Sequence, residues 1–142
     1  MSGTYLTPLH VSHSVKDIDA SIEWYMKHLH FELVFKMYLA VHNAHLAFLR
    51  HGTFIVELFM HDESKPIPES RLDPHEDQKT RGCKHLGFLV DDAEKLCERL
   101  RSEGVTIVRE PKVMENPEKG IREKIFFIHD PDRINIEFCE RL

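Results

Sequence analysis

Two histidines and two glutamates occur at matching places in the two halves of the sequence. His10 and His85 each begin a segment that reaches a Val five residues later and an Asp two residues after that. Each half then closes on an apolar segment with a single Glu in its middle, Glu57 in the first half and Glu137 in the second. Self-similarity over a long period indicates two related modules. Each module therefore contributes one His and one Glu.

These residue types favour metal chemistry. Neutral imidazoles and carboxylates together suit a divalent ion such as Zn, Ni, Co or Fe, and four such ligands leave room for water or substrate. A carboxylate in a concave, partly dry site is costly unless it is paired or binds a metal. Such a carboxylate can also move a proton as a base, while the metal stabilises an enolate-like oxyanion.

The four residues fall in predicted strands whose alternate positions are apolar. The apolar positions are Val11 and Val15 beside His10, Phe54, Val56 and Leu58 beside Glu57, Leu86, Phe88 and Val90 beside His85, and Ile134, Ile136 and Phe138 beside Glu137. Successive side chains of a strand point to opposite faces of its sheet. If helices cover the apolar face, all four polar groups lie on the other face.

The order of predicted elements is strand, helix and three strands, followed by the same series again. Strands are expected at 9–15, 32–41, 44–50 and 53–60, and then at 82–90, 105–109, 124–129 and 134–140. Helices are expected at 17–29, capped by Asp17, and at 92–103, which ends before Gly104. Residues 62–81 contain several prolines and many charges and are predicted to be a linker, and residues 111–120 are predicted to be a loop.

Bulk properties exclude several classes of partner. A net charge of −5 over 142 residues disfavours nucleic acid or an anionic membrane as the main partner. No apolar run approaches the ~20 residues of a membrane span, and no signal peptide is visible. The three cysteines show no paired spacing, so we expect buried thiols in a protein of the reducing cytoplasm.

The sequence resembles the vicinal oxygen chelate superfamily, which includes glyoxalase I, methylmalonyl-CoA epimerase, fosfomycin-resistance proteins and extradiol dioxygenases. The resemblance covers about residues 8–140 and rests on segments 10–25, 56–58, 85–88 and 130–138. It implies one α+β domain over residues 1–142, with βαβββ modules at about 8–61 and 82–141 joined by the linker. The modules would form an open cup-shaped mixed sheet with helices on its outer face.

The resemblance also implies the site. The metal ligands would be His10, Glu57, His85 and Glu137, around one divalent ion per site, which could be Ni, Co, Zn, Mn or Fe. Glu at both carboxylate positions looks most like glyoxalase I, a lyase that moves a proton next to a carbonyl through a metal-bound enediolate. By that analogy Glu137 is the catalytic base, with Glu57 the less favoured choice. We expect a homodimer, with the cup formed within one chain or across two.

One position departs from the glyoxalase I pattern. Ser14 stands where those enzymes carry an Arg that holds glutathione, and Arg50, Lys36 or Arg122 could supply that charge instead. The resemblance implies a small-molecule substrate, either a hemithioacetal or an acyl thioester.

Alternative functions remain. An acyl-CoA epimerase of the methylmalonyl-CoA type shares the enolate chemistry and often has Gln at the position of Glu57. A non-catalytic protein of the drug-resistance type would bind a small molecule in the same cup, but such proteins usually lose the His and Glu set. Extradiol dioxygenases and fosfomycin proteins use three ligands, which disfavours both.

Overall fold

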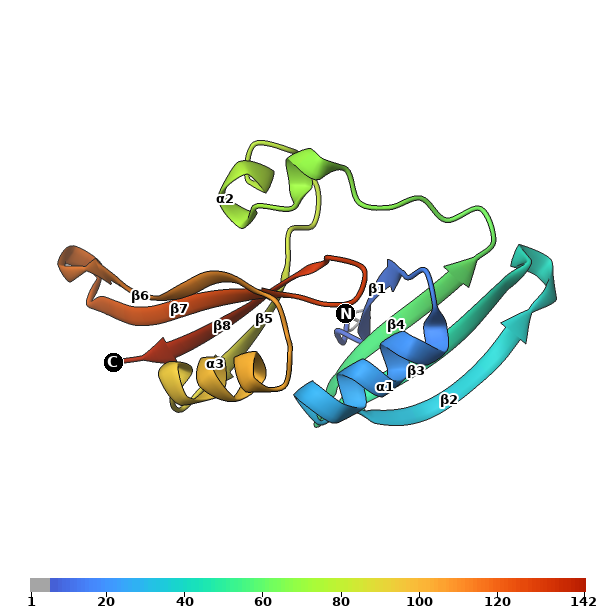
Figure 1. Ribbon diagram of the computed structural model, residues 1–142, viewed down its shortest axis with the longest axis horizontal. Coiled ribbons are helices and arrows are strands. Elements are labelled where there is room, and N and C mark those ends of the chain that lie inside the picture. The colour runs from blue at the N-terminus through green and yellow to red at the C-terminus, as the bar shows by residue number, and fades with distance from the viewer. Residues whose placement is uncertain (1–5) are drawn as a thin grey trace, which may run out of the picture. The chain divides into compact units, whose positions relative to one another are not determined.

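The computed structural model describes residues 6–142, which divide into two compact units. The first unit ends at Lys65 and the second runs from Pro66 to Leu142. Each unit contains a four-stranded mixed sheet, and Figure 1 shows a helix against one face of each sheet.

The first unit has the order strand, helix and three strands. Its elements are β1 (His10–Ser14), α1 (Ile18–Leu29), β2 (Glu32–Leu39), β3 (Ala44–His51) and β4 (Phe54–His61). The strands lie in the order β1-β4-β3-β2, with β1 parallel to β4 and the other pairs antiparallel. A parallel pair requires a long crossover connection, which α1, β2 and β3 provide here.

The second unit repeats this topology. Its corresponding elements are β5 (Leu86–Val90), α3 (Ala93–Ser102), β6 (Ile107–Asn116), β7 (Ile121–His129) and β8 (Asn135–Arg141). The strand order is β5-β8-β7-β6, and β5 is parallel to β8. The predicted α+β fold class with two βαβββ modules is therefore confirmed.

Both long helices begin at the aspartates that the sequence indicated. The Asp17 carboxylate accepts hydrogen bonds from the backbone N–H groups of Asp19 and Ala20, at 3.1 and 3.0 Å. The Asp92 carboxylate accepts one from Lys95 at 2.9 Å. These bonds satisfy backbone donors that have no partner inside the helix, so each cap fixes where its helix starts.

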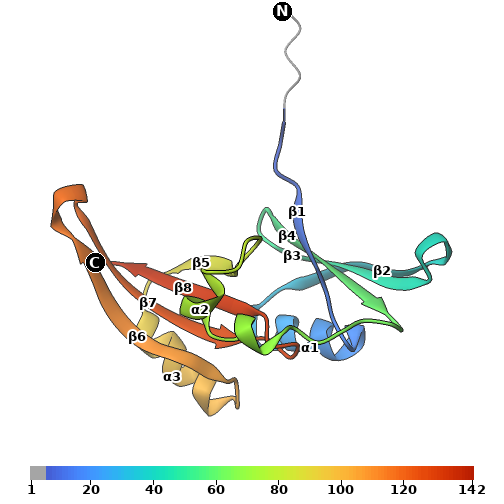
Figure 2. The ribbon, with the colours of Figure 1, turned by 90° about the horizontal axis from the view of Figure 1, so that it is seen from above.

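The core of each unit lies between its helix and one face of its sheet. In the first unit α1 buries residues such as Ile18, Ile22 and Tyr25 against β-strand residues such as Val56 and Leu58. In the second unit α3 packs on β6, β7 and β8, and Figure 2 shows α3 beside β6. The helix buries Ala93, Cys97 and Leu100, and the buried strand residues of this core are Phe126, Ile128, Ile136 and Phe138. Apolar strand positions therefore face the helices, as predicted.

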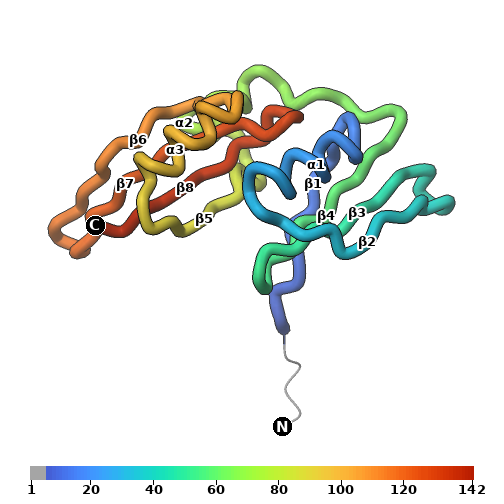
Figure 3. Tube along the Cα trace, turned by 60° about the horizontal axis from the view of Figure 1, so that its bottom comes forward, coloured from blue at the N-terminus to red at the C-terminus, as the bar shows by residue number. Residues whose placement is uncertain are grey.

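The expected loop at 111–120 is wrong. Most of it belongs to β6, which continues to Asn116 and pairs with β7 along its length, as Figure 3 shows. A short 3-10 helix, Pro117–Lys119, then forms the turn into β7. Pro111 lies at a break in the β6 register, a position where a strand tolerates the missing N–H of proline.

Residues 66–81 also contain structure that the sequence analysis did not anticipate. They include a 3-10 helix, Glu69–Arg71, and the one-turn helix α2 (Pro74–Asp77). Figure 1 shows α2 and α3 on opposite sides of the second sheet. The second unit therefore carries a helical segment on the face that α3 leaves open.

Two further sequence expectations concern thiols and membranes. All three cysteines are free; Cys97 is buried as expected, whereas Cys83 is exposed. Within residues 6–142, no helix is both long and apolar enough to span a bilayer.

Candidate functional site

In the first unit, the predicted ligands His10 and Glu57 lie side by side. His10 Nε2 is 3.3 Å from Glu57 Oε2, and the two side chains are 30% and 13% exposed. The strand neighbours of Glu57 on the other face, Val56 and Leu58, are fully buried. Burial of these neighbours under α1 therefore holds the carboxylate on the open face of the sheet.

The second unit makes the same arrangement from His85 and Glu137. His85 Nε2 is 3.4 Å from Glu137 Oε2, and the two side chains are 32% and 24% exposed. His85 lies one residue before β5, and Glu137 lies within β8 between buried Ile136 and Phe138. The structure thus brings together one predicted His and one predicted Glu in each unit.

The strand register explains why each pair forms. Glu57 on β4 pairs with Ser12 on β1, and Glu137 on β8 pairs with Gly87 on β5. In both units this partner stands two residues after the His, so it lies on the same face of the strand as the His. The small side chain of Ser12 and the absent one of Gly87 leave the Glu carboxylate free to approach the imidazole.

A phenylalanine completes each pair, and sequence reasoning missed it. Phe48 pairs with Glu57 across β3 and β4, and Phe127 pairs with Glu137 across β7 and β8. The ring centroids of His10 and Phe48 are 5.3 Å apart, and those of His85 and Phe127 are 5.4 Å apart. Each imidazole therefore packs against an aromatic ring beside its carboxylate. Knowledge of the register would have been needed to find these residues.

The spacing of the two polar atoms in each pair fits a shared divalent ion. Two ligand atoms that each lie about 2.1 Å from such an ion are about 3.0 Å apart at a right angle and about 3.4 Å apart at the tetrahedral angle. The observed separations of 3.3 and 3.4 Å fall in that range. Within neither unit do the described residues gather three or more His, Cys, Asp or Glu side chains. Each unit therefore offers two candidate ligands.

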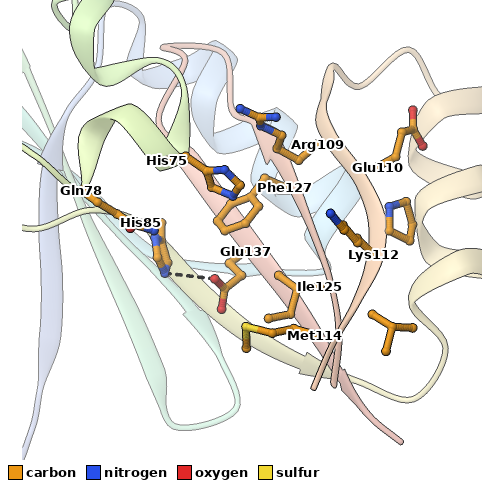
Figure 4. A pocket seen from close by; sticks show the side chains of 12 residues that line it. His75, Gln78, His85, Arg109, Glu110, Lys112, Met114, Ile125, Phe127 and Glu137 are labelled. Carbon is orange, nitrogen blue, oxygen red and sulfur yellow. Dashed lines mark ion pairs between the residues drawn. The ribbon is translucent and has the colours of Figure 1, made fainter. Parts of the chain in front are cut away.

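A cavity of about 660 Å³ opens beside the His85–Glu137 pair in the second unit. Its lining comprises His75, Gln78, His85, Arg109, Glu110, Pro111, Lys112, Val113, Met114, Ile125, Phe127 and Glu137. Figure 4 shows His85 facing Glu137, with Ile125 between Glu137 and Lys112. Small-molecule sites commonly have volumes of about 300–1,000 Å³ and combine apolar walls with a few polar groups. The cavity has the size and composition of a ligand pocket.

A set of polar contacts anchors α2, which supplies His75 to the pocket and is followed by its C-cap residue Gln78, also in the lining. The buried Asp77 carboxylate accepts a hydrogen bond from Arg71 Nε at 2.8 Å and lies 3.2 Å from Lys84 Nζ. The hydrogen bond from Arg71 and the positive charges of Arg71 and Lys84 lower the pKa of Asp77. Asn135 Nδ2 on β8 donates to the Arg71 carbonyl at 3.1 Å. These contacts tie the segment to the sheet and fix one wall of the pocket.

The basic residues considered from the sequence as glutathione-binding groups each have a carboxylate partner. The contacts are Lys36 with Asp19 at 2.6 Å, Arg50 with Glu32 at 3.0 Å and Arg122 with Glu115 at 2.7 Å. The pocket lining includes none of the three. The pocket instead carries Arg109 and Lys112, which sequence reasoning did not select.

His13 lies on the helix side of β1, as its position in the strand predicted. The hydroxyl of Tyr25 on α1 lies 3.3 Å from His13 Nε2. Burial lowers the pKa of His13 from 6.5 to about 4. His13 is therefore a half-buried residue that is neutral near pH 7, on the face opposite the candidate ligand His10.

The chain matches one protein family over almost its whole length. The family model for the Glyoxalase/Bleomycin resistance protein/Dioxygenase superfamily matches residues 7–138. A lactoylglutathione lyase from Escherichia coli O157:H7 is 30% identical over 132 residues, which cover 93% of this chain and 90% of that protein. A probable chloroplastic lactoylglutathione lyase from Arabidopsis thaliana is 31% identical over 137 residues and 94% of this chain. The chain spans only 35% of that plant protein.

Solved structures show the same likeness. Glyoxalase I from Zea mays superposes with a TM-score of 0.71 at 28% identity, covering 94% of this chain and 46% of that chain. A glyoxalase family protein from Enterococcus faecalis gives a TM-score of 0.75 at 22% identity, covering 94% and 97% of the two chains. The second likeness concerns the fold alone.

Proposed function

Because the chain belongs to the glyoxalase/bleomycin resistance protein/dioxygenase superfamily, we propose that it is a divalent-metal-dependent lyase or isomerase of the glyoxalase I type. The observation that carries the proposal is the repeated His–Glu contact, at 3.3 Å in one unit and 3.4 Å in the other. Relatives about 30% identical that are named lactoylglutathione lyase support the same reaction class.

In this proposal, His10, Glu57, His85 and Glu137 together hold one ion of Ni, Co, Zn, Mn or Fe. When bound, such an ion supplies Lewis-acid stabilisation of negative charge on a carbonyl oxygen of the substrate. Each unit contributes two ligands, either within one chain or from two chains of a homodimer.

Glu137 is the residue that we assign to proton transfer. Its carboxylate takes a proton from the carbon next to the substrate carbonyl and returns it to the adjacent carbon. Glu137 lines the pocket, and its side chain is 24% exposed compared with 13% for Glu57. A substrate therefore reaches Glu137 more easily. Phe127 and Ile125 provide an apolar surface beside the reacting atoms, which limits the access of water.

Metal content and affinity test the proposal directly. The protein is stripped with a chelator and titrated with Ni, Co, Zn and Mn. We expect about one ion per chain in the wild type and loss of binding in His85→Ala and in Glu137→Ala, because each change removes one ligand. His42→Ala is the matched control, since His42 lies in an exposed 3-10 turn between β2 and β3 and is not one of the four candidate ligands.

Activity then separates the base from the ligands. Glu137→Gln keeps the shape of the side chain but cannot accept a proton, so we expect turnover of hemithioacetals or acyl-CoA epimers to fall by about 10²–10⁴-fold. Full activity of Glu137→Gln would refute the base assignment. Absence of metal binding by the wild type would refute the enzyme proposal, and unchanged ligand binding after chelation would instead indicate a non-catalytic binding protein.

A further inference from the structure

A β-bulge in β6 places two basic side chains on the same face of the sheet as Glu137. Arg109 pairs with Phe127 and Lys112 pairs with Ile125, and the register shifts between them. In an unbroken strand, residues three apart point to opposite faces. The extra residue of the bulge brings Lys112 back to the face of Arg109. Because Phe127 pairs directly with Glu137, all these side chains share the pocket face.

The charges on this face are not equally available to a ligand. Arg109 forms an ion pair with Asp73, the residue that caps α2. Glu110 contributes to the pocket wall, but its carboxylate lies 2.6 Å from Arg101 on α3. Lys112 makes no ion pair with any of residues 6–142, and its side chain is exposed at the pocket. Lys112 therefore supplies the positive charge that a ligand in this pocket can use.

We propose that Lys112 determines substrate specificity by binding a carboxylate or phosphate oxyanion that lies remote from the reacting carbonyl. The inference rests on the proposed function, because it takes the Glu137 carboxylate as the reacting centre. Neighbouring strands are about 4.8 Å apart, so β6 and β8, with β7 between them, are about 10 Å apart. The oxyanion is therefore several bonds away from the carbon that loses its proton. Ile125 and Phe127 on β7 line the path of the connecting chain.

Equilibrium binding tests this inference without requiring turnover. Metal-loaded protein is titrated calorimetrically with three thiols: glutathione, which carries carboxylates, coenzyme A, which carries phosphates, and neutral 2-mercaptoethanol. Any contact of the thiol itself is common to all three probes. We expect Lys112→Met to weaken binding of glutathione, coenzyme A or both by about tenfold, the loss of one charge-assisted hydrogen bond. Which probe responds identifies the oxyanion.

Two variants control for effects of shape and of net charge. Lys112→Arg keeps the positive charge and is expected to retain affinity within about threefold, since either cation binds an oxyanion. Lys119→Met removes a lysine from the turn between β6 and β7, outside the pocket lining, and should bind every probe like the wild type. If the lysine acted only through the net charge of the protein, both Met variants would bind the anionic probes equally weakly. That result would overturn the assignment.

The outcomes distinguish this inference from the proposed function. Equal affinities of wild type and Lys112→Met for both anionic probes, or no binding of either probe by the wild type, would overturn the role of Lys112. If the protein gives either of these results and still turns over its substrate, the proposed function stands. Loss of anionic binding in Lys112→Met, in a protein that turns over no hemithioacetal or acyl thioester, would support the oxyanion site and refute the proposed function.

Discussion

The half-buried His13 gives the protein a specific weakness at acid pH. Its ring lies on the helix face of β1, where the Tyr25 hydroxyl is 3.3 Å from Nε2, and burial lowers its pKa from 6.5 to about 4. In the unfolded chain His13 takes up a proton as the pH falls below 6.5. The native state keeps it neutral until about pH 4, because a buried imidazolium would lose its hydration.

The sign and size of the effect follow from this difference. Between pH 6.5 and 4 the unfolded state binds more protons than the native state, so the free energy of unfolding decreases as the pH falls. A depression from 6.5 to about 4 corresponds to about 3 kcal/mol when the titration is complete. Between pH 7.5 and pH 5 the same linkage gives a loss of about 2 kcal/mol.

Urea unfolding of the chelator-treated protein, followed by circular dichroism at several pH values, measures this loss. His13→Leu should remove about 2 kcal/mol of the pH dependence between pH 7.5 and 5. The variant also loses the contact with Tyr25, which lowers its stability by about 1 kcal/mol at every pH and leaves the slope unaffected. His10→Leu is the matched control, since His10 lies on the same strand but on the opposite, open face.

The two variants should also differ in metal binding. His13→Leu should keep its ion, whereas His10→Leu should lose it under the proposed function. A His13→Leu variant with the same pH dependence of stability as the wild type would refute the linkage argument. Loss of metal in His13→Leu but not in His10→Leu would refute the assignment of faces on β1.

Two further predictions concern stability. Asp77→Ala should lower the free energy of unfolding, measured in urea, by about 3 kcal/mol, because it leaves Arg71 and Lys84 without their shared buried partner. A change below about 0.5 kcal/mol would show that the segment carrying α2 is not anchored in this way. Arg133→Gly should raise stability by about 0.5 kcal/mol, because Arg133 has a φ of 67° and the relief of left-handed strain exceeds the added entropy of the unfolded chain. A lower urea midpoint for Arg133→Gly would contradict that estimate.

Local sequence signals were sufficient for the elements that contain the candidate ligands. Asp17 and Asp92 cap α1 and α3 because a short acidic side chain can satisfy the first backbone N–H groups of a helix. The alternation of apolar and polar residues around Glu57 and Glu137 predicted the correct faces, since each strand has one side buried under a helix. The fold class and the faces on which the candidate ligands lie could therefore be predicted.

The errors arose where local composition and tertiary structure disagree. The sequence of β6 contains Pro111 and several charged residues, a composition typical of a loop. The strand tolerates this composition because most of its residues are exposed and Pro111 lies at a bulge. The helix α2 did have a sequence signal that was not used: Asp73 precedes Pro74 and is followed three residues later by Glu76, the pattern of a helix start with proline in the first turn.

Neither Phe127 nor Lys112 could be assigned from the sequence, for a related reason. Each depends on which residues lie opposite each other in the sheet, and a one-residue change of register moves a side chain to the other face. Phe127 reaches His85 because it pairs with Glu137, and Lys112 reaches the pocket because the β6 bulge reverses its direction. The hydrophobic pattern specifies faces within an unbroken strand, but it does not show where a bulge will occur.

The two units share one set of features and differ in another, which suggests how roles are divided in the proposed enzyme. Both contain a His, a Glu and a Phe in the same register, and under the proposed function the two His–Glu pairs hold one ion. α2 with His75 and the bulge with Lys112 belong to the second unit and to its pocket. Changes in the repeated set should therefore affect metal binding, whereas changes at Lys112 should alter which substrate binds and leave the affinity for the ion unchanged.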